Sequence, residues 1–174
     1  MYKELTWRDD DINWLTDLKQ FAKIHDFFDR YNVKHTIALI AKDIHKNQEL
    51  IDYIKSKENI DVQLHCWNHI SFPHNLDILK DELKLSIDAI EKHFGKKPVT
   101  VFPPWNRTNE QVEQICGNLG LNVSVLKSGI SNYVKNVGNI DERIINFHYW
   151  NDGDTMFLER ALQLYHERKT MCIQ

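Results

Sequence analysis

Short hydrophobic runs alternate with amphipathic segments along the chain. The runs that fit buried strands are Glu4–Arg8, Thr36–Ala41, Ile60–Leu64, Val99–Phe102, Leu121–Leu126, Ile144–Phe147 and Met171–Ile173. Apolar side chains at helical spacing predict helices over 16–31, 48–57, 76–94 and 109–119, and a last one from Asp154 or Thr155 to Lys169. Strands that alternate with helices predict an α/β fold with a mainly parallel sheet.

Two architectures fit this alternation, an open doubly wound sheet and a closed or distorted barrel. No glycine-rich turn follows the first strand, so a common nucleotide-binding sheet is disfavoured. A complete eight-stranded barrel takes about 250 residues, and this chain has 174. Nothing in the sequence has the composition of a linker, so we expect a single domain over residues 1–174.

Composition narrows the class of protein. The formal net charge is −3, which argues against a nucleic-acid binder that works through bulk positive charge. No apolar stretch approaches the roughly 20 residues of a membrane helix. The start, MYKELTWRDDD, lacks an apolar signal region, so we expect a cytoplasmic protein, although export through a partner stays open. Three cysteines without CxxC spacing do not predict a disulfide framework.

The residues that carry chemistry gather at four predicted strand ends. Asp9-Asp10-Asp11 follows the first strand, and His65-Cys66-Trp67-Asn68-His69 follows the third. Residues 103–107, Pro-Pro-Trp-Asn-Arg, and residues 148–150, His-Tyr-Trp, follow two later strands. In a parallel α/β barrel these ends share one face, where active sites form. Their common location predicts one site.

Two imidazoles four residues apart bind one metal ion when a carboxylate completes the set. His65 and His69 have this spacing, and the aspartate run supplies the carboxylate. Adjacent carboxylates repel one another unless a cation compensates them, and Arg8 directly precedes the run. Two histidines and one aspartate suit zinc best, and nickel, cobalt or iron would accept the same ligands. We therefore expect one divalent metal.

The order of these motifs resembles the polysaccharide deacetylase family, carbohydrate esterase family 4. That family has a first motif TFDDG, a second HSxxH or HTxxH, a third with a Pro-Pro pair and a late LxH. This chain has RDDD at 8–11, HxxxH at 65–69, PPWNR at 103–107 and Phe147-His148. Motifs in this order over residues 4–150 mark a divergent branch. The resemblance implies a distorted (β/α) barrel, here with about seven parallel strands.

The resemblance also implies roles. Asp10 looks like the catalytic base and His148 like the general acid. Asp11, His65 and His69 look like the metal ligands. A shift by one residue would instead make Asp9 and Asp10 the base and ligand.

Around these, Pro104-Trp105 resembles the segment that walls the groove and offers a backbone N–H to the oxyanion. Asn106 and Arg107 are candidates to bind substrate hydroxyls or a neighbouring carboxylate. Trp67 and Trp150, with Trp105 and Tyr149, are candidates to stack on sugar rings.

One departure stands out, because Phe102 occupies the position at which the third motif usually has an arginine that holds the catalytic aspartate. Arg8 or Arg107 is the candidate replacement. The expected function is metal-dependent removal of N-acetyl groups from an amino-sugar oligo- or polysaccharide, with acetate released and no nucleic-acid or membrane partner. Two alternatives stay open: a small-molecule amide or imide hydrolase, and a non-catalytic carbohydrate-binding derivative.

Overall fold

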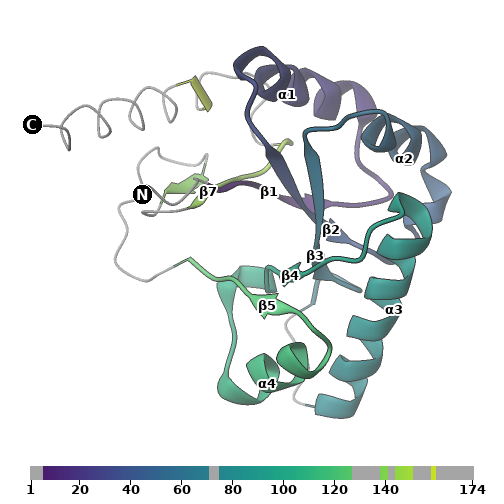
Figure 1. Ribbon diagram of the computed structural model, residues 1–174, viewed down its shortest axis with the longest axis vertical. Coiled ribbons are helices and arrows are strands. Elements are labelled where there is room, and N and C mark those ends of the chain that lie inside the picture. The colour runs from purple at the N-terminus through teal and green to yellow at the C-terminus, as the bar shows by residue number, and fades with distance from the viewer. Residues whose placement is uncertain (1–5, 71–74, 127–137, 141–143, 151–157, 160–174) are drawn as a thin grey trace, which may run out of the picture.

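The computed structural model describes residues 6–70, 75–126, 138–140, 144–150 and 158–159 (Figure 1). In chain order its elements are β1 (Thr6–Ile12), α1 (Leu18–Tyr31), β2 (His35–Ile40), the 3₁₀ turn η1 (Ile44–Lys46), α2 (Gln48–Lys55), β3 (Ile60–Cys66), α3 (Leu76–Phe94), β4 (Thr100–Val101), the 3₁₀ turn η2 (Pro104–Asn106), α4 (Glu110–Asn118), β5 (Asn122–Val123), β6 (Gly138–Ile140) and β7 (Ile144–Phe147). The strands and helices alternate as predicted.

The strands form one curved sheet in the order β5-β4-β3-β2-β1-β7-β6. It curls into a half-barrel, with α1, α2 and α3 along one side of the curve (Figure 1). This confirms the α/β fold and the distorted barrel. Six of the described strands run parallel, in agreement with the mainly parallel sheet that was predicted, and β6 is an additional strand antiparallel to β7. The hydrophobic pattern does not predict β6, since this strand is three residues long and begins with glycine.

Polar caps set the helix boundaries. The side chains of Asn75 and Asn109 accept hydrogen bonds from backbone N–H groups in the first turns of α3 and α4. α3 ends at Gly95, whose φ of 74° is the left-handed conformation in which glycine costs least. No helix among the described residues is both long and apolar enough to cross a membrane. The predicted elements at 154–169 and 171–173 lie outside the described residues, apart from helical backbone at 158–159.

The hydrophobic core lies between the sheet and its helices. β2 is buried along nearly its whole length, as expected for a strand inside a parallel sheet. β1 is different, because Arg8, Asp9 and Asp10 are all buried within it. Burying charged groups costs free energy unless they are paired. Their partners therefore identify what this strand is built to hold.

β1 extends through the aspartate run, which corrects the prediction that the run follows the strand. Alternation along a strand turns Arg8 and Asp10 to one side and Asp9 to the other. Asp11 breaks the alternation: its φ is 66°, and the register with β2 shifts between Asp9 and Ile12. This irregularity turns the Asp11 carboxylate away from the side that Asp9 faces.

Candidate metal and catalytic site

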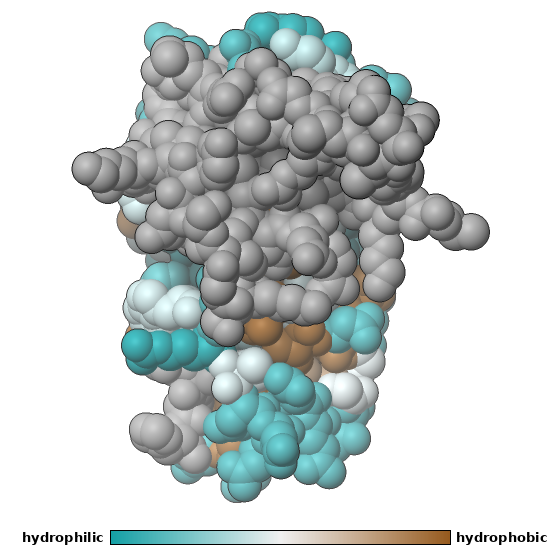
Figure 2. Space-filling model, turned by 90° about the vertical axis from the view of Figure 1, so that its left-hand side faces the viewer, coloured by the Kyte–Doolittle hydropathy of each residue, from teal (hydrophilic) through white to brown (hydrophobic). Residues whose placement is uncertain are grey.

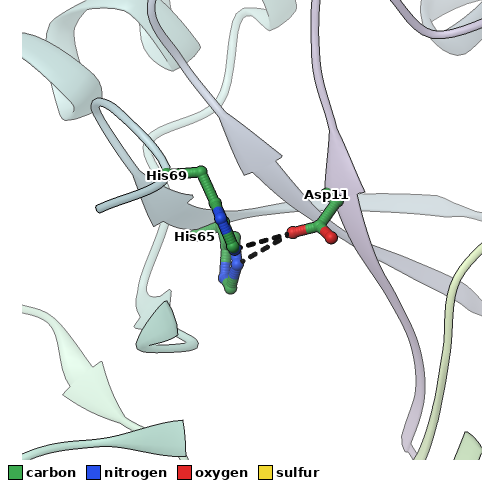
Figure 3. Close-up of side chains that lie close together, drawn as sticks. All are labelled: Asp11, His65 and His69. Atoms are coloured by element: carbon green, nitrogen blue, oxygen red, sulfur yellow. Dashed lines mark ion pairs between the residues drawn. The ribbon is translucent and has the colours of Figure 1, made fainter. Parts of the chain in front are cut away.

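Three side chains converge at the carboxyl edge of the sheet: Asp11 from β1, His65 from β3 and His69 from the segment after β3. Asp11 Oδ1 lies 3.3 Å from His65 Nε2 and 3.0 Å from His69 Nε2. Figure 3 shows the carboxylate pointing from β1 toward both rings. One ligand atom from each residue lies within 4.8 Å of the others. One carboxylate and two imidazoles at this spacing form a donor set that a divalent metal such as zinc accepts.

The orientation of His65 suits a metal ligand. His65 is buried at the end of β3, and its Nδ1 donates to the carbonyl oxygen of Phe102 at 2.5 Å. That bond fixes the tautomer and leaves the Nε2 lone pair directed at Asp11. A histidine that binds a metal is commonly oriented through its second nitrogen in this way. Cys66, beside it, packs inward as expected.

Asp11 carries a concentrated negative charge. Burial alone would raise its pKa, but the nearby His65 and His69 outweigh burial and lower the pKa well below its ordinary value. In turn, Asp11 raises the pKa of His69. Among the described residues, the buried Oδ1 of Asp11 has no hydrogen bond of good geometry. A buried oxygen that lacks such a bond and faces two imidazole nitrogens fits a metal ion.

Asp10 is held by an arginine from its own strand. The Arg8 guanidinium is completely buried and lies 2.6 Å from Asp10 Oδ2. It also lies 4.9 Å from the centre of the Phe102 ring, which stands where the family usually has its arginine. Of the two candidates named from the sequence, Arg8 therefore supplies the guanidinium. Asp10 Oδ1 is buried without a hydrogen bond in the described part of the chain, so it is available to take a proton.

His148 completes the group from the end of β7. Its Nε2 lies 3.6 Å from Asp11 Oδ2. Burial lowers the pKa of His148, and the carboxylates of Asp10 and Asp11 oppose that shift. The ring of Trp150, which is half exposed, lies 4.9 Å from that of His148. The structure thus brings Asp10, Asp11 and His148 together.

The segment after β4 has an unusual backbone. Trp105 and Asn106 have φ of 54° and 55°, a left-handed conformation that costs a bulky residue free energy. The Trp105 ring is exposed and lies 4.8 Å from His69. Pro104, the preceding residue, is buried. The Asn106 Oδ1 accepts hydrogen bonds from Arg8 and from the Leu126 backbone N–H, so this oxygen braces the protein interior.

Three predicted residues are not drawn into this group. Arg107 is exposed, and no ion pair in the described residues joins it to Asp10. Trp67 is partly buried and packs against the hydrophobic core. Tyr149 is also buried in the core, so of the four aromatic candidates only Trp105 and Trp150 present exposed rings beside site histidines.

Asp9 faces the other side of β1, as alternation requires. It accepts a hydrogen bond from the Tyr149 backbone N–H at 2.8 Å and lies 3.3 Å from His35 Nε2. Of the two registers considered for the aspartates, the geometry therefore favours Asp10 with Asp11. The buried pair of His35 and His25 behind Asp9 escaped the sequence analysis, because His25 falls on the apolar stripe of its helix and neither histidine belongs to a motif.

A sequence profile of polysaccharide deacetylases matches residues 5–124, which is most of the chain. The chain belongs to the polysaccharide deacetylase family. The match covers the aspartate run, the HxxxH motif and the Pro-Pro pair, whereas His148 lies beyond it. No curated protein sequence matches the chain.

Solved structures of polysaccharide deacetylase-like proteins are similar to the chain in fold. The peptidoglycan deacetylase PdaC from Bacillus subtilis has a TM-score of 0.68 at 18% identity, over 88% of this chain and 79% of that one. A family 4 acetyl xylan esterase from Clostridium thermocellum, in complex with a cobalt ion, has a TM-score of 0.62 at 20% identity, over 84% and 74%.

A third similar structure is a pseudoenzyme of the same family from Bacillus anthracis. It has a TM-score of 0.61 at 20% identity, over 70% of this chain and 42% of that one, so the chain spans less than half of that protein. At these identities the likeness establishes the fold. Whether this chain is an active enzyme rests on its own residues.

Proposed function

We propose that this protein is a metal-dependent hydrolase that removes N-acetyl groups from an amino-sugar oligo- or polysaccharide and releases acetate. One observation carries the proposal: the metal-type set of Asp11, His65 and His69 lies beside a paired carboxylate, Asp10, and a further histidine, His148. Amide hydrolysis needs an activated water, a proton acceptor and a proton donor. This group offers a residue for each task.

A divalent metal bound by Asp11, His65 and His69 would polarise the acetyl carbonyl and make its bound water more acidic. Asp10 then accepts the proton of the attacking water on Oδ1, the oxygen that Arg8 does not hold. Arg8 keeps that carboxylate in one orientation from its buried position. Because the buried guanidinium holds Oδ2 of Asp10, the Oδ1 atom points in one fixed direction, as a general base requires.

His148 is placed to protonate the departing amine. An amine leaves poorly as an anion, so proton donation from a positioned group accelerates this step. The backbone N–H near Trp105 is the proposed donor to the oxyanion. The exposed rings of Trp105 and Trp150 flank the site histidines, and such flat rings stack on sugar faces. The side of the molecule shown in Figure 2 has a hydrophobic area bordered by hydrophilic residues.

Zinc is the proposed metal, since two imidazoles and one carboxylate form a common catalytic zinc set. The cobalt ion in the acetyl xylan esterase structure makes cobalt a reasonable substitute to test. We also propose that the protein acts in the cytoplasm, with export through a partner as the alternative.

The first experiment measures metal content and acetate release together. Wild type, purified without a histidine tag, should hold about one equivalent of metal, as expected for one such site. It should release acetate from N-acetylated chito-oligosaccharides. The double variant His65→Ala/His69→Ala should lose both while remaining folded. A matched control, His45→Ala/His93→Ala, removes two histidines outside the site and should retain both.

The same measurement separates the alternatives. Metal bound without acetate release from any acetylated sugar, but with hydrolysis of small cyclic amides, would make this a small-molecule hydrolase. Sugar binding without turnover would place the chain with the pseudoenzymes, a possibility that the replacement of the family arginine by Phe102 raises. Failure of wild type to load metal from zinc, nickel or cobalt buffer would refute the proposal.

A further inference from the structure

A buried polar cluster lies on the side of β1 that faces away from the candidate site. It consists of Asp9 on β1, His35 at the start of β2 and His25 on α1, and none of the three side chains is exposed to solvent. His35 Nε2 lies 3.3 Å from Asp9 Oδ2, and His35 Nδ1 lies 3.1 Å from His25 Nδ1. The proposed reaction uses none of these groups. Burying three polar side chains costs free energy, so a cluster of this kind in the core points to a specific structural or functional role.

The cluster allows one arrangement of protons when both histidines are neutral. A carboxylate only accepts, so His35 Nε2 carries a hydrogen and donates to Asp9. The Nδ1 of His35 must then accept, and the hydrogen between the rings belongs to His25 Nδ1. This leaves His25 Nε2 bare, and that atom has no hydrogen bond in the described part of the chain, although Asp29 Oδ1 lies 3.2 Å away.

Aromatic rings shield this cluster from solvent and stack on its imidazoles. Phe28 stacks on His35 at 4.0 Å with an angle of 7° between the rings, and Phe21 stacks at 5.5 Å. Burial in these surroundings lowers the pKa of both His25 and His35. The two imidazoles are therefore neutral at physiological pH, as the proton arrangement assumes.

Both neighbours of His148 in the chain contact this cluster. The backbone N–H of Tyr149, the next residue, donates to Asp9 Oδ1 at 2.8 Å. The ring of Phe147, the preceding residue, lies 5.9 Å from that of His35 and nearly parallel to it. His148 is thus held on both sides, while its own ring reaches across to Asp11.

We propose that Asp9, supported by the His35–His25 pair, is a positioning residue that fixes the end of β7 and so places His148 opposite Asp11. This inference rests on the proposed function, in which His148 donates the proton. It goes further by assigning a task to the third aspartate of the run. Asp9 acts through the Tyr149 backbone, on the opposite side of β1 from the metal ligands.

Two substitutions at Asp9 separate positioning from folding. Asp9→Leu keeps the approximate size but removes the acceptor for the Tyr149 N–H. We expect kcat to fall by about tenfold to a hundredfold, part of what a general acid contributes. KM and metal content should change little. Asp9→Asn keeps an acceptor oxygen for Tyr149 and should recover most of the loss. Equal kcat in Asp9→Leu and wild type would overturn the proposal.

A matched control tests for general damage to the core. Phe27→Leu disturbs the same helix–sheet layer, since Phe27 packs on Trp7 and Phe28, but Phe27 belongs neither to the Asp9 cluster nor to the end of β7. At a similar loss of thermal stability, this variant should keep the kcat of wild type. A fall equal to that of Asp9→Leu would show that core stability alone explains the effect and would contradict the proposal.

Nitrogen-15 NMR of the histidine rings provides a test without turnover. In wild type, His35 should be protonated at Nε2 and His25 at Nδ1. In Asp9→Asn, an amide hydrogen facing His35 should reverse both tautomers, because each ring accepts where it previously donated. The opposite tautomers in wild type would overturn the proposed anchor. This result does not depend on acetate release, so failure of the anchor and failure of the deacetylase activity can be told apart.

Discussion

At the scale of single residues, the site depends on how three consecutive aspartates divide their tasks. Regular alternation would turn Asp9 and Asp11 to the same side of β1. The left-handed φ of Asp11 breaks that pattern, so Asp11 reaches His65 and His69 while Asp9 stays with the helix layer. A backbone irregularity thereby gives three like residues three environments: an imidazole pair, an arginine and a buried histidine.

Asp10 should be essential for turnover but not for metal binding. Asp10→Asn keeps the shape and an acceptor for Arg8 but cannot take a proton from water. We expect kcat to fall by about a hundredfold to ten-thousandfold, the usual contribution of a general base. Metal content should stay at the wild-type level in elemental analysis. Loss of metal together with activity would mean that Asp10 is a ligand, and the register of the aspartates would need to be revised.

Arg8 should not tolerate replacement by lysine. Its guanidinium contacts Asp10 and Asn106 at once, and a single ammonium cannot reproduce that fork. Arg8→Lys should lower kcat by about tenfold or more, in line with losing a guanidinium that holds Asp10 and Asn106 together. Moving the arginine to the usual position of the family, in Arg8→Met/Phe102→Arg, should restore part of the rate relative to Arg8→Met alone. No difference between these two variants would argue against a shared task.

At the scale of elements, the turn η2 has a backbone conformation that does not suit its central residue, Trp105. The turn follows β4 through the Pro103-Pro104 pair, and it also presents the Trp105 ring to His69. The price is a tryptophan in a left-handed backbone conformation, which costs about 1 to 3 kcal/mol. Strain of this kind persists where the surrounding structure enforces it, and here the residue lies at the proposed substrate face.

Trp105→Gly should therefore separate stability from function. Glycine adopts this φ without strain, so the free energy of unfolding should fall less than in Trp105→Ala, by roughly 1 kcal/mol. Both variants lack the ring and should show a similar rise in KM for acetylated sugars. Chemical denaturation and steady-state kinetics on the same preparations provide the comparison. Equal stability of the two variants would show that the backbone here carries no strain.

At the scale of the whole molecule, the half-barrel buries the histidine pair His25 and His35 between β1, β2 and α1. Burial lowers the pKa of His35 well below its ordinary value, so folded His35 stays neutral at mildly acid pH. An unfolded histidine binds a proton near pH 6.5. Between these two pKa values the unfolded chain holds more protons, and the free energy of unfolding decreases as the pH falls.

Thermal unfolding should consequently show a Tm that declines from about pH 7 toward pH 5, a window set by the unfolded histidine pKa. The slope is at most about 1.4 kcal/mol per pH unit for each histidine involved. His35→Phe should be less stable at pH 7 but flatter across this window. Lowered carboxylate pKa values, as at Asp11 and Asp29, act below about pH 5, and the raised pKa of His69 opposes the decline equally in wild type and variant. A variant curve parallel to that of wild type would disprove the assignment.

The sequence by itself determined the local structure and the list of chemically useful residues. Apolar spacing and polar caps were enough to predict α3 over 76–94 and the Asn109 cap of α4, because these depend on neighbours within a turn or two. The motif order was enough to indicate the family and to nominate Asp11, His65 and His69. The sequence pattern also placed these residues near the carboxyl ends of predicted strands, and this was enough to expect that they converge.

Only the tertiary structure decided how those residues are shared out. It chose Arg8 over Arg107 as the partner of Asp10, set Trp67 against the core and turned the oxygen of Asn106 inward. It also joined Asp9 to His35 and Tyr149, which are far away in sequence. Such choices depend on one bulge in β1 and on which strand lies beside which. Local propensity does not encode these long-range contacts, because they form only when strands that are distant in sequence pair in the sheet.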